Sequence, residues 1–173
     1  MKYHLKVIVE TISQQRIKIL QASQAGNSTH YQGSQRSEIF NDFVGIPWVL
    51  GGNTKSGADC WGLVSLVSDT VCGVKIKEHI GSCESGNVLN AIITDEMQSN
   101  RWVMQHGPAF GNVAVMFDKM SDRPMHVGIT VDENYILHSP DHNNKSGSQI
   151  HKIKLLNRVF SRIEYYKYDN CIS

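Results

Sequence analysis

The feature that most constrains the fold is a change of hydrophobic period in the second half of this 173-residue chain. In the first half, apolar residues recur at the three- and four-residue spacing of helices, whereas later they alternate in short runs. The alternating runs predict strands at 112–117, 126–131, 135–138, 149–155 and 162–168. Because helical segments come first and the strands follow closely, we predict an α+β fold with its helices packed on one face of an antiparallel sheet.

Three helices are predicted before the sheet. The first covers 37–44 and is stopped by Gly45, and the second covers 60–72 and is stopped by Gly73. A third follows from the apolar spacing within 88–97.

The chain is long enough for one ordinary domain and too short for two. Its first twenty residues alternate as in a short β-hairpin, and 21–35 form a polar stretch rich in Gln, Ser and Gly. We therefore predict a hairpin appendage and linker over 1–33, followed by one compact domain over 34–173.

The charge pattern argues against two classes of partner. Lys and Arg total 17 and Asp and Glu total 16, a net charge of +1 without any block of one sign. We expect no nucleic-acid partner, because such a partner requires a basic footprint. The apolar run Val7–Val9 is far shorter than a signal peptide core or a membrane span, so we expect neither a leader nor membrane insertion.

No cofactor is expected. The four cysteines are expected to stay as thiols. Cys72, His79 and Cys83 have a spacing that could recruit zinc, but no further close Cys or His pair completes a tetrahedral site. No glycine-rich phosphate loop is present either.

The stretch GADCWGLV, residues 57–64, places Cys60 where a helical pattern begins. Two interpretations compete: a buried packing cysteine, or a nucleophile whose thiolate is stabilised by the free N–H groups of the helix start. A nucleophilic cysteine requires a base within hydrogen-bond reach and a third group that orients the base.

Two histidines could supply that pair. His126 opens one predicted strand and His138 closes the next, and their even separation keeps both side chains on one face, within about 5 Å of each other. Satisfied packing or surface histidines are the alternative. His142 and His151 lie in or beside a polar loop, where we expect a solvated role or contact with a substrate.

Two segments resemble the NlpC family of papain-like cell-wall cysteine peptidases. They are GIPWVLGGNTKSGADCWGLV at 45–64 and HVGITVDENYILHS at 126–139. The family pattern has a Pro-Tyr-x-x-Gly-Gly loop, an Asp-Cys-x-Gly helix start, a His-Val-Gly-Ile strand and a third polar residue on the following strand. The matching positions span nearly all of 37–168. The resemblance implies a papain-like fold with the catalytic cysteine at a helix N-terminus.

The resemblance also implies the roles of the site residues. Cys60 would be the nucleophile, His126 the general base and His138 the orienting third member, while Asp59 would hold the free amine of a stem peptide. The implied reaction is hydrolysis of an amide in peptidoglycan, most often between γ-D-glutamyl and meso-diaminopimelate, without a metal.

Three positions depart from the family pattern. Trp48 replaces a tyrosine that helps bind the oxyanion, and its indole N–H could take over that hydrogen bond. Trp61 replaces a serine, and we place it in the substrate-binding part of the site; Asp-Cys-Trp-Gly-Leu-Val resembles the subgroup found in tail-tip assembly proteins of long-tailed phages. Asn112 replaces an aspartate, and we interpret it as structural.

Together these features predict a thiol hydrolase of peptidoglycan stem peptides in a phage or prophage tail. We expect it in the host cytoplasm before assembly and then in the virion tail, where it would act on the periplasmic wall and contact tail proteins through its N-terminal segment. Two alternatives stay open: an antibacterial effector, amidase or transferase on the same fold, or a non-catalytic tail assembly protein.

Overall fold

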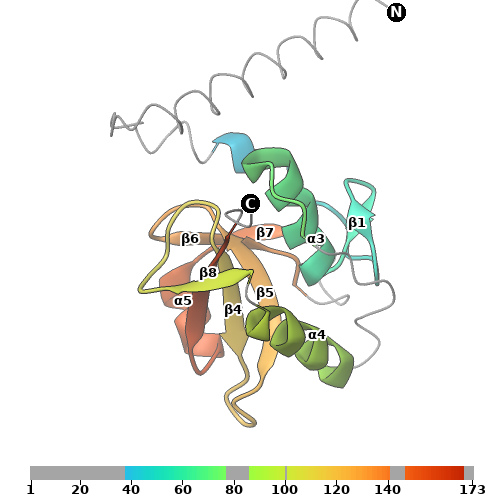
Figure 1. The fold of residues 1–173 in the computed structure, drawn as a ribbon. Helices are drawn as coiled ribbons and strands as arrows, with labels where there is room; N and C mark the ends of the chain where they lie inside the picture. The colour runs from blue at the N-terminus through green and yellow to red at the C-terminus, as the bar shows by residue number, and fades with distance from the viewer. Residues whose placement is uncertain (1–37, 77–85, 100, 141–146, 170–173) are drawn as a thin grey trace, which may run out of the picture. The chain divides into compact units, whose positions relative to one another are not determined.

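The computed structural model of the protein describes residues 38–76, 86–99, 101–140 and 147–169 (Figure 1). The predicted hairpin and linker at 1–33 lie outside these residues, so the proposed domain boundary stays a prediction. Within the described ranges, no helix is both long and apolar enough to cross a bilayer.

A six-stranded sheet forms the centre of the fold, and every neighbouring pair of strands is antiparallel, as the sequence predicts. The spatial order is β3-β8-β4-β5-β6-β7. The strands are β3 Trp102–Gln105, β4 Val113–Phe117, β5 Pro124–Thr130, β6 Tyr135–His138, β7 Gln149–Lys152 and β8 Ile163–Tyr168. A second, two-stranded sheet pairs β1 Asn53–Thr54 with β2 Gly57–Ala58.

The predicted helices are present. A helical turn at 38–41 leads to Gly45, which has a φ of +81°. Helix α3 Cys60–Val67 continues as the π-helix η1 Ser68–Cys72 and ends at Gly73, which has a φ of +68°. Helix α4 spans Gly86–Gln98. Gly73 therefore caps η1, and Gly45 ends the turn after the first helical segment, both in the left-handed conformation that favours glycine.

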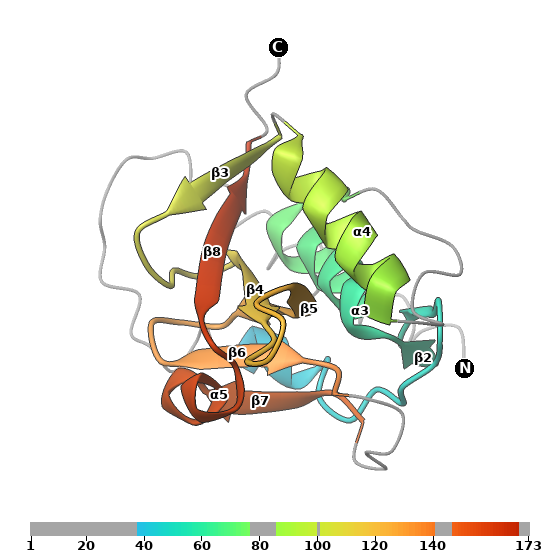
Figure 2. The same cartoon turned by 90° about the horizontal axis from the view of Figure 1, so that it is seen from below.

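Helices cover both faces of the sheet. On β4, Val113 and Val115 belong to one apolar cluster with Trp61 of α3 and Ile93 of α4. The alternate residues Ala114 and Met116 belong to a second cluster, which includes Leu156 and Phe160 in and just after helix α5 Ile153–Val159. Figures 1 and 2 show α3 and α4 on one side of the sheet and α5 on the other. The prediction of one covered face therefore holds for α3 and α4, and α5 is an addition to it.

Two elements differ from the sequence prediction. The strand expected at 149–155 ends at Lys152, and α5 begins at the next residue. Ile153, Leu156 and Phe160 recur at three- and four-residue spacing and join one cluster, so burial favours a helix over the local alternation. Strand β3 was not predicted. Trp102 is its sole buried residue, so its sequence carries no alternation of buried and exposed positions.

Helix α3 lies unusually close to the loop before it. A Cβ added at Gly62 would lie 1.8 Å from the backbone oxygen of Gly52 and 2.8 Å from its carbonyl carbon. Any side chain at this position would therefore push the helix away from the loop that precedes the hairpin β1–β2. Glycine is required here by a backbone contact.

We predict that Gly62→Ala lowers the free energy of unfolding by about 3 kcal/mol, because the added methyl group meets rigid backbone. Denaturant titration measures this change. Gly107→Ala is the matched control, since an added Cβ there has no atom within 4 Å. Equal stability of the two variants would contradict the close approach of helix and loop.

Candidate active site

The start of α3 is fixed by Asp59, which caps the helix. Its Oδ1 accepts a hydrogen bond from the Gly62 N–H at 2.7 Å, and its Oδ2 accepts one from the Gly51 N–H at 2.8 Å. The residue is 2% exposed, so one buried carboxylate holds both the helix start and the preceding loop. Cys60 follows as the first residue of α3. Its thiol thus lies at the positive end of the helix dipole.

The sheet supplies the histidines from β5 and β6. His138 pairs with Gly128 in the register, so His126 lies two residues along β5, diagonal to His138 and on the same face. The His126 Nε2 lies 2.8 Å from the His138 Nδ1, a hydrogen-bonding distance, and the ring centroids are 5.0 Å apart. The structure therefore brings the two predicted histidines together.

The residue after His138 connects the strand to the start of α3. The Ser139 hydroxyl donates a hydrogen bond to the Ala58 carbonyl at 3.0 Å, and both groups are buried. Cys60 also shares an apolar cluster with Val127, the neighbour of His126. These contacts join the backbone segments that carry Cys60 and the histidine pair, whereas the His126 ring itself faces Phe160 on the α5 side of the sheet.

A third histidine joins the pair and was not predicted to do so. The His138 Nε2 lies 2.7 Å from the Nδ1 of His151, which comes from β7. We expected a solvated role or substrate contact for His151; it is half-buried in β7, and it also makes this contact with His138. The predicted strand over 149–155 would have indicated this only together with its pairing to β6, which puts residues 149 and 151 on the face of His138.

Burial keeps the histidines neutral. His126 is half-buried and its ring stacks on Phe160, with centroids 6.0 Å apart and planes 2° from parallel. Desolvation lowers the pKa of His126 to about 4. His138 is 5% exposed, and desolvation, reinforced by repulsion from His126 and His151, lowers its pKa further still. Near pH 7 the pair is uncharged, the state in which a histidine can accept a proton.

The other predicted site residues occupy different environments. Trp48 is half-buried in the loop before β1. Trp61 is 2% exposed in the core, which leaves its side chain almost no surface for a substrate. Asn112 is buried, and its carbonyl accepts from the N–H and hydroxyl of Thr130, consistent with a structural role. The substrate and oxyanion roles of Trp48, Asp59 and Trp61 stay predictions.

The second described cysteine has a different character. Cys72 is half-buried at the end of η1, and desolvation raises the pKa of its thiol to about 11. It is therefore a poor nucleophile near neutral pH. His79 and Cys83, considered with it as zinc ligands, lie outside the described residues, and the residues that are described contain no group of three side chains able to hold a metal.

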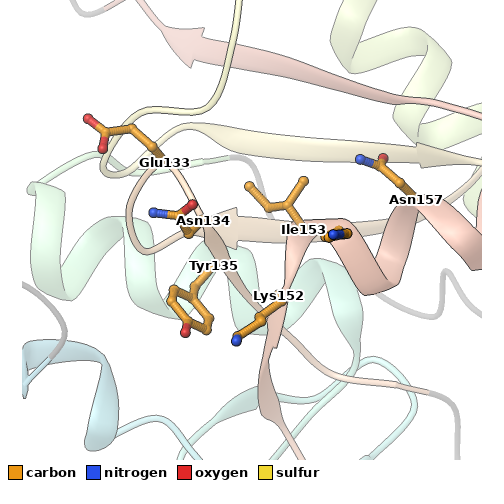
Figure 3. A pocket seen from close by; sticks show the side chains of 7 residues that line it. Glu133, Asn134, Tyr135, Lys152, Ile153 and Asn157 are labelled. Atoms are coloured by element: carbon orange, nitrogen blue, oxygen red, sulfur yellow. The ribbon is translucent and has the colours of Figure 1, made fainter.

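A surface hollow of about 470 Å³ lies at the end of β6 opposite His138 (Figure 3). Its lining residues are Glu133, Asn134, Tyr135, Lys152, Ile153, Lys154 and Asn157. None of them is a cysteine or a histidine, so this hollow is separate from the Cys60 and histidine cluster.

The sequence profile of the NlpC/P60 family matches residues 45–162, a span that contains the cysteine and all three clustered histidines. The chain belongs to the NlpC/P60 family. This family comprises cysteine peptidases that act on peptidoglycan. No curated protein sequence matches the chain.

Two solved structures of the same family resemble this chain. The NlpC/p60 domain of the peptidoglycan hydrolase SagA is 16% identical, over 78% of this chain and 97% of that one, with a TM-score of 0.49. An NLP/P60 family protein similar to lipoproteins, from Staphylococcus aureus subsp. aureus Mu50, is 15% identical, over 82% of this chain and 44% of that one, with a TM-score of 0.44.

The lowered histidine pKa predicts acid sensitivity of the fold. Between pH 6.5 and about 4, His126 binds a proton in the unfolded protein but not in the folded one. The free energy of unfolding is therefore undiminished by this residue above pH 6.5 and decreases as the pH falls below it. We expect this residue to lower the free energy of unfolding by up to about 3 kcal/mol across that window. Denaturant titrations from pH 4 to 8 measure it.

His126→Gln should flatten this pH dependence, and His106→Gln, a change at an exposed histidine, should leave it as in the wild type. Parallel pH profiles for the wild type and His126→Gln would show that His126 does not remain neutral in the folded state.

Proposed function

We propose that the chain is a thiol hydrolase that cleaves amide bonds in peptidoglycan stem peptides, and that its bond is the one between γ-D-glutamyl and diaminopimelate. The observation that carries the proposal is the hydrogen-bonded pair His126–His138, in a member of this family whose α3 begins at Cys60. Family membership supports the substrate class. The particular bond follows from the resemblance of the two motif segments.

The proposed reaction uses Cys60 and His126 in two half-reactions. His126 takes the thiol proton, the thiolate attacks the carbonyl carbon, and the oxyanion of the tetrahedral intermediate forms beside the start of α3. The carbon–nitrogen bond then breaks, and His126 gives its proton to the departing amine. Water attacks the thioester with His126 as base again, which releases the acid and restores the thiol.

Two donors are proposed for the oxyanion. The Cys60 backbone N–H lies in the first turn of α3, at the positive end of the helix dipole. The indole N–H of Trp48 is the second, in place of the family tyrosine. Trp48 is only half-buried, which suits a group that contacts substrate.

Asp59 is proposed to attract the free amine of the stem peptide through its negative charge, which acts from below the surface because the side chain is 2% exposed. Each of its oxygens already accepts one backbone N–H, and a carboxylate oxygen has a second acceptor position. The same group would thus hold the helix start and attract the amine. Trp61 would contribute indirectly, by fixing from the core the backbone that follows Cys60.

The proposed setting is the tail of a phage or prophage. It is supported by Asp-Cys-Trp-Gly-Leu-Val at 59–64, which resembles the tail-tip subgroup of the family. In this proposal the protein is present in the host cytoplasm before assembly and is then incorporated into the tail. It cleaves the periplasmic peptidoglycan locally when the tail penetrates the wall.

We predict that the reduced wild type cuts a diaminopimelate-containing tetrapeptide muropeptide after γ-D-glutamate, and that Cys60→Ala abolishes the product while leaving the fold intact. Mass spectrometry of the digested muropeptides measures this result. Cys72→Ala is the matched control and should retain activity, because its thiol stays protonated near neutral pH.

Cleavage by Cys60→Ala would overturn the assignment of the nucleophile. Absence of any cleavage by well-folded wild type would overturn the hydrolase proposal and favour a non-catalytic assembly role. Transfer of the acyl group to an added amine in place of water would identify a transferase.

We predict that the chain copurifies with tail particles from cells that encode it, as detected by mass spectrometry of the particles. Deletion of residues 1–33 should prevent incorporation if this segment binds tail proteins, whereas Cys60→Ala should be incorporated like the wild type. Exclusion of the full-length protein from purified tails would contradict the proposed setting.

A further inference from the structure

The three clustered histidines form a line of hydrogen bonds that begins at the proposed base. His126 contacts His138 through Nε2 and Nδ1 at 2.8 Å, and His138 contacts His151 through Nε2 and Nδ1 at 2.7 Å. His138 is therefore engaged at both ring nitrogens. The nitrogen of His126 that His138 does not occupy is Nδ1.

A neutral histidine carries one N–H and one lone pair, so neighbouring rings in such a line must have matching tautomers. Two arrangements are self-consistent. In one, each ring donates from Nε2, and the Nδ1 of His126 is a lone pair that can accept the thiol proton. In the other, each ring donates from Nδ1, and His126 can no longer act as a base. Burial keeps His126 and His138 neutral, so neither of these two rings avoids the choice by taking up a second proton.

The productive arrangement places an N–H at the Nε2 of His138, a residue that is 5% exposed. A buried N–H requires an acceptor, and among the described residues the group at hydrogen-bond distance is the Nδ1 of His151. His151 is half-buried at the outer end of the line, so its own N–H can reach water.

We propose that His151 is a positioning residue: as the acceptor for His138, it fixes the tautomer of His138 and, through it, the tautomer that lets His126 deprotonate Cys60. This inference rests on the proposed function, because it takes His126 as the base for that thiol. It extends the Cys60, His126 and His138 set by one member that does not touch the substrate.

Two variants of similar size to histidine test the proposal at position 151. His151→Asn keeps an acceptor oxygen close to the place of Nδ1, whereas His151→Leu has a similar shape and no acceptor. We expect Leu to lower kcat by about 10- to 100-fold with little change in KM, and Asn to restore most of the activity.

Two further measurements require no peptidoglycan. Nitrogen chemical shifts of the imidazole rings report the tautomer of His126, which should be the Nε2–H form in the wild type and Asn variant and should shift toward Nδ1–H in the Leu variant. The alkylation rate of Cys60 against pH, followed on its own peptide, should show a higher apparent thiol pKa in the Leu variant only.

An unchanged His126 tautomer and an unchanged alkylation profile in a folded His151→Leu protein would overturn the inference. An equal loss of kcat in the Leu and Asn variants would also overturn the inference, because the shape of the side chain and not its acceptor would then determine activity. If the wild type cleaves no muropeptide but the tautomer and alkylation profile respond to position 151 as expected, the proposed substrate fails and the positioning role stands.

Discussion

The buried carboxylate of Asp59 is the interaction on which the rest of the site depends. It would be costly to bury without partners, and the N–H groups of Gly51 and Gly62 supply them from the loop and the helix. Because both partners are backbone groups, the bond fixes the direction in which α3 leaves the loop. Gly62 then permits the helix to touch the carbonyl of Gly52. The position of Cys60 follows from these constraints.

A second set of constraints comes from the sheet. Gly128 pairs with His138, and a side chain at Gly128 would meet the His138 Cβ at 3.0 Å and the Ile136 Cγ2 at 2.5 Å. The missing side chain allows β5 and β6 to approach closely while His126 and His138 share a face. The bond from Ser139 to Ala58 then joins the end of β6 to the start of α3. The start of α3 and the end of β6, which are far apart in sequence, are thus held together by this short contact.

The parts predictable from sequence are those set by local patterns. The α3 start was predictable because an acidic cap precedes an apolar helical spacing, and the His126 and His138 pairing because a short turn separates two alternating runs. The role of His151 depends on which strand lies beside β6, and the local pattern of 149–155 does not state that. Helix α5 was hidden because the β-branched residues Ile150 and Ile153 favour a strand, and only packing of Leu156 and Phe160 against the sheet decides between the two structures.

Burial of the histidines has two opposing effects on the proposed chemistry. It keeps His126 neutral and therefore able to accept a proton, but it also disfavours the imidazolium that forms. The thiolate appears at the same moment at the start of α3, so the two new charges stabilise each other in a poorly solvated place. His138 is the more deeply buried of the two rings, so a positive charge is less favourable there than on His126. In the proposed reaction His126 therefore returns the proton to the departing amine, and His138 serves as its hydrogen-bond partner.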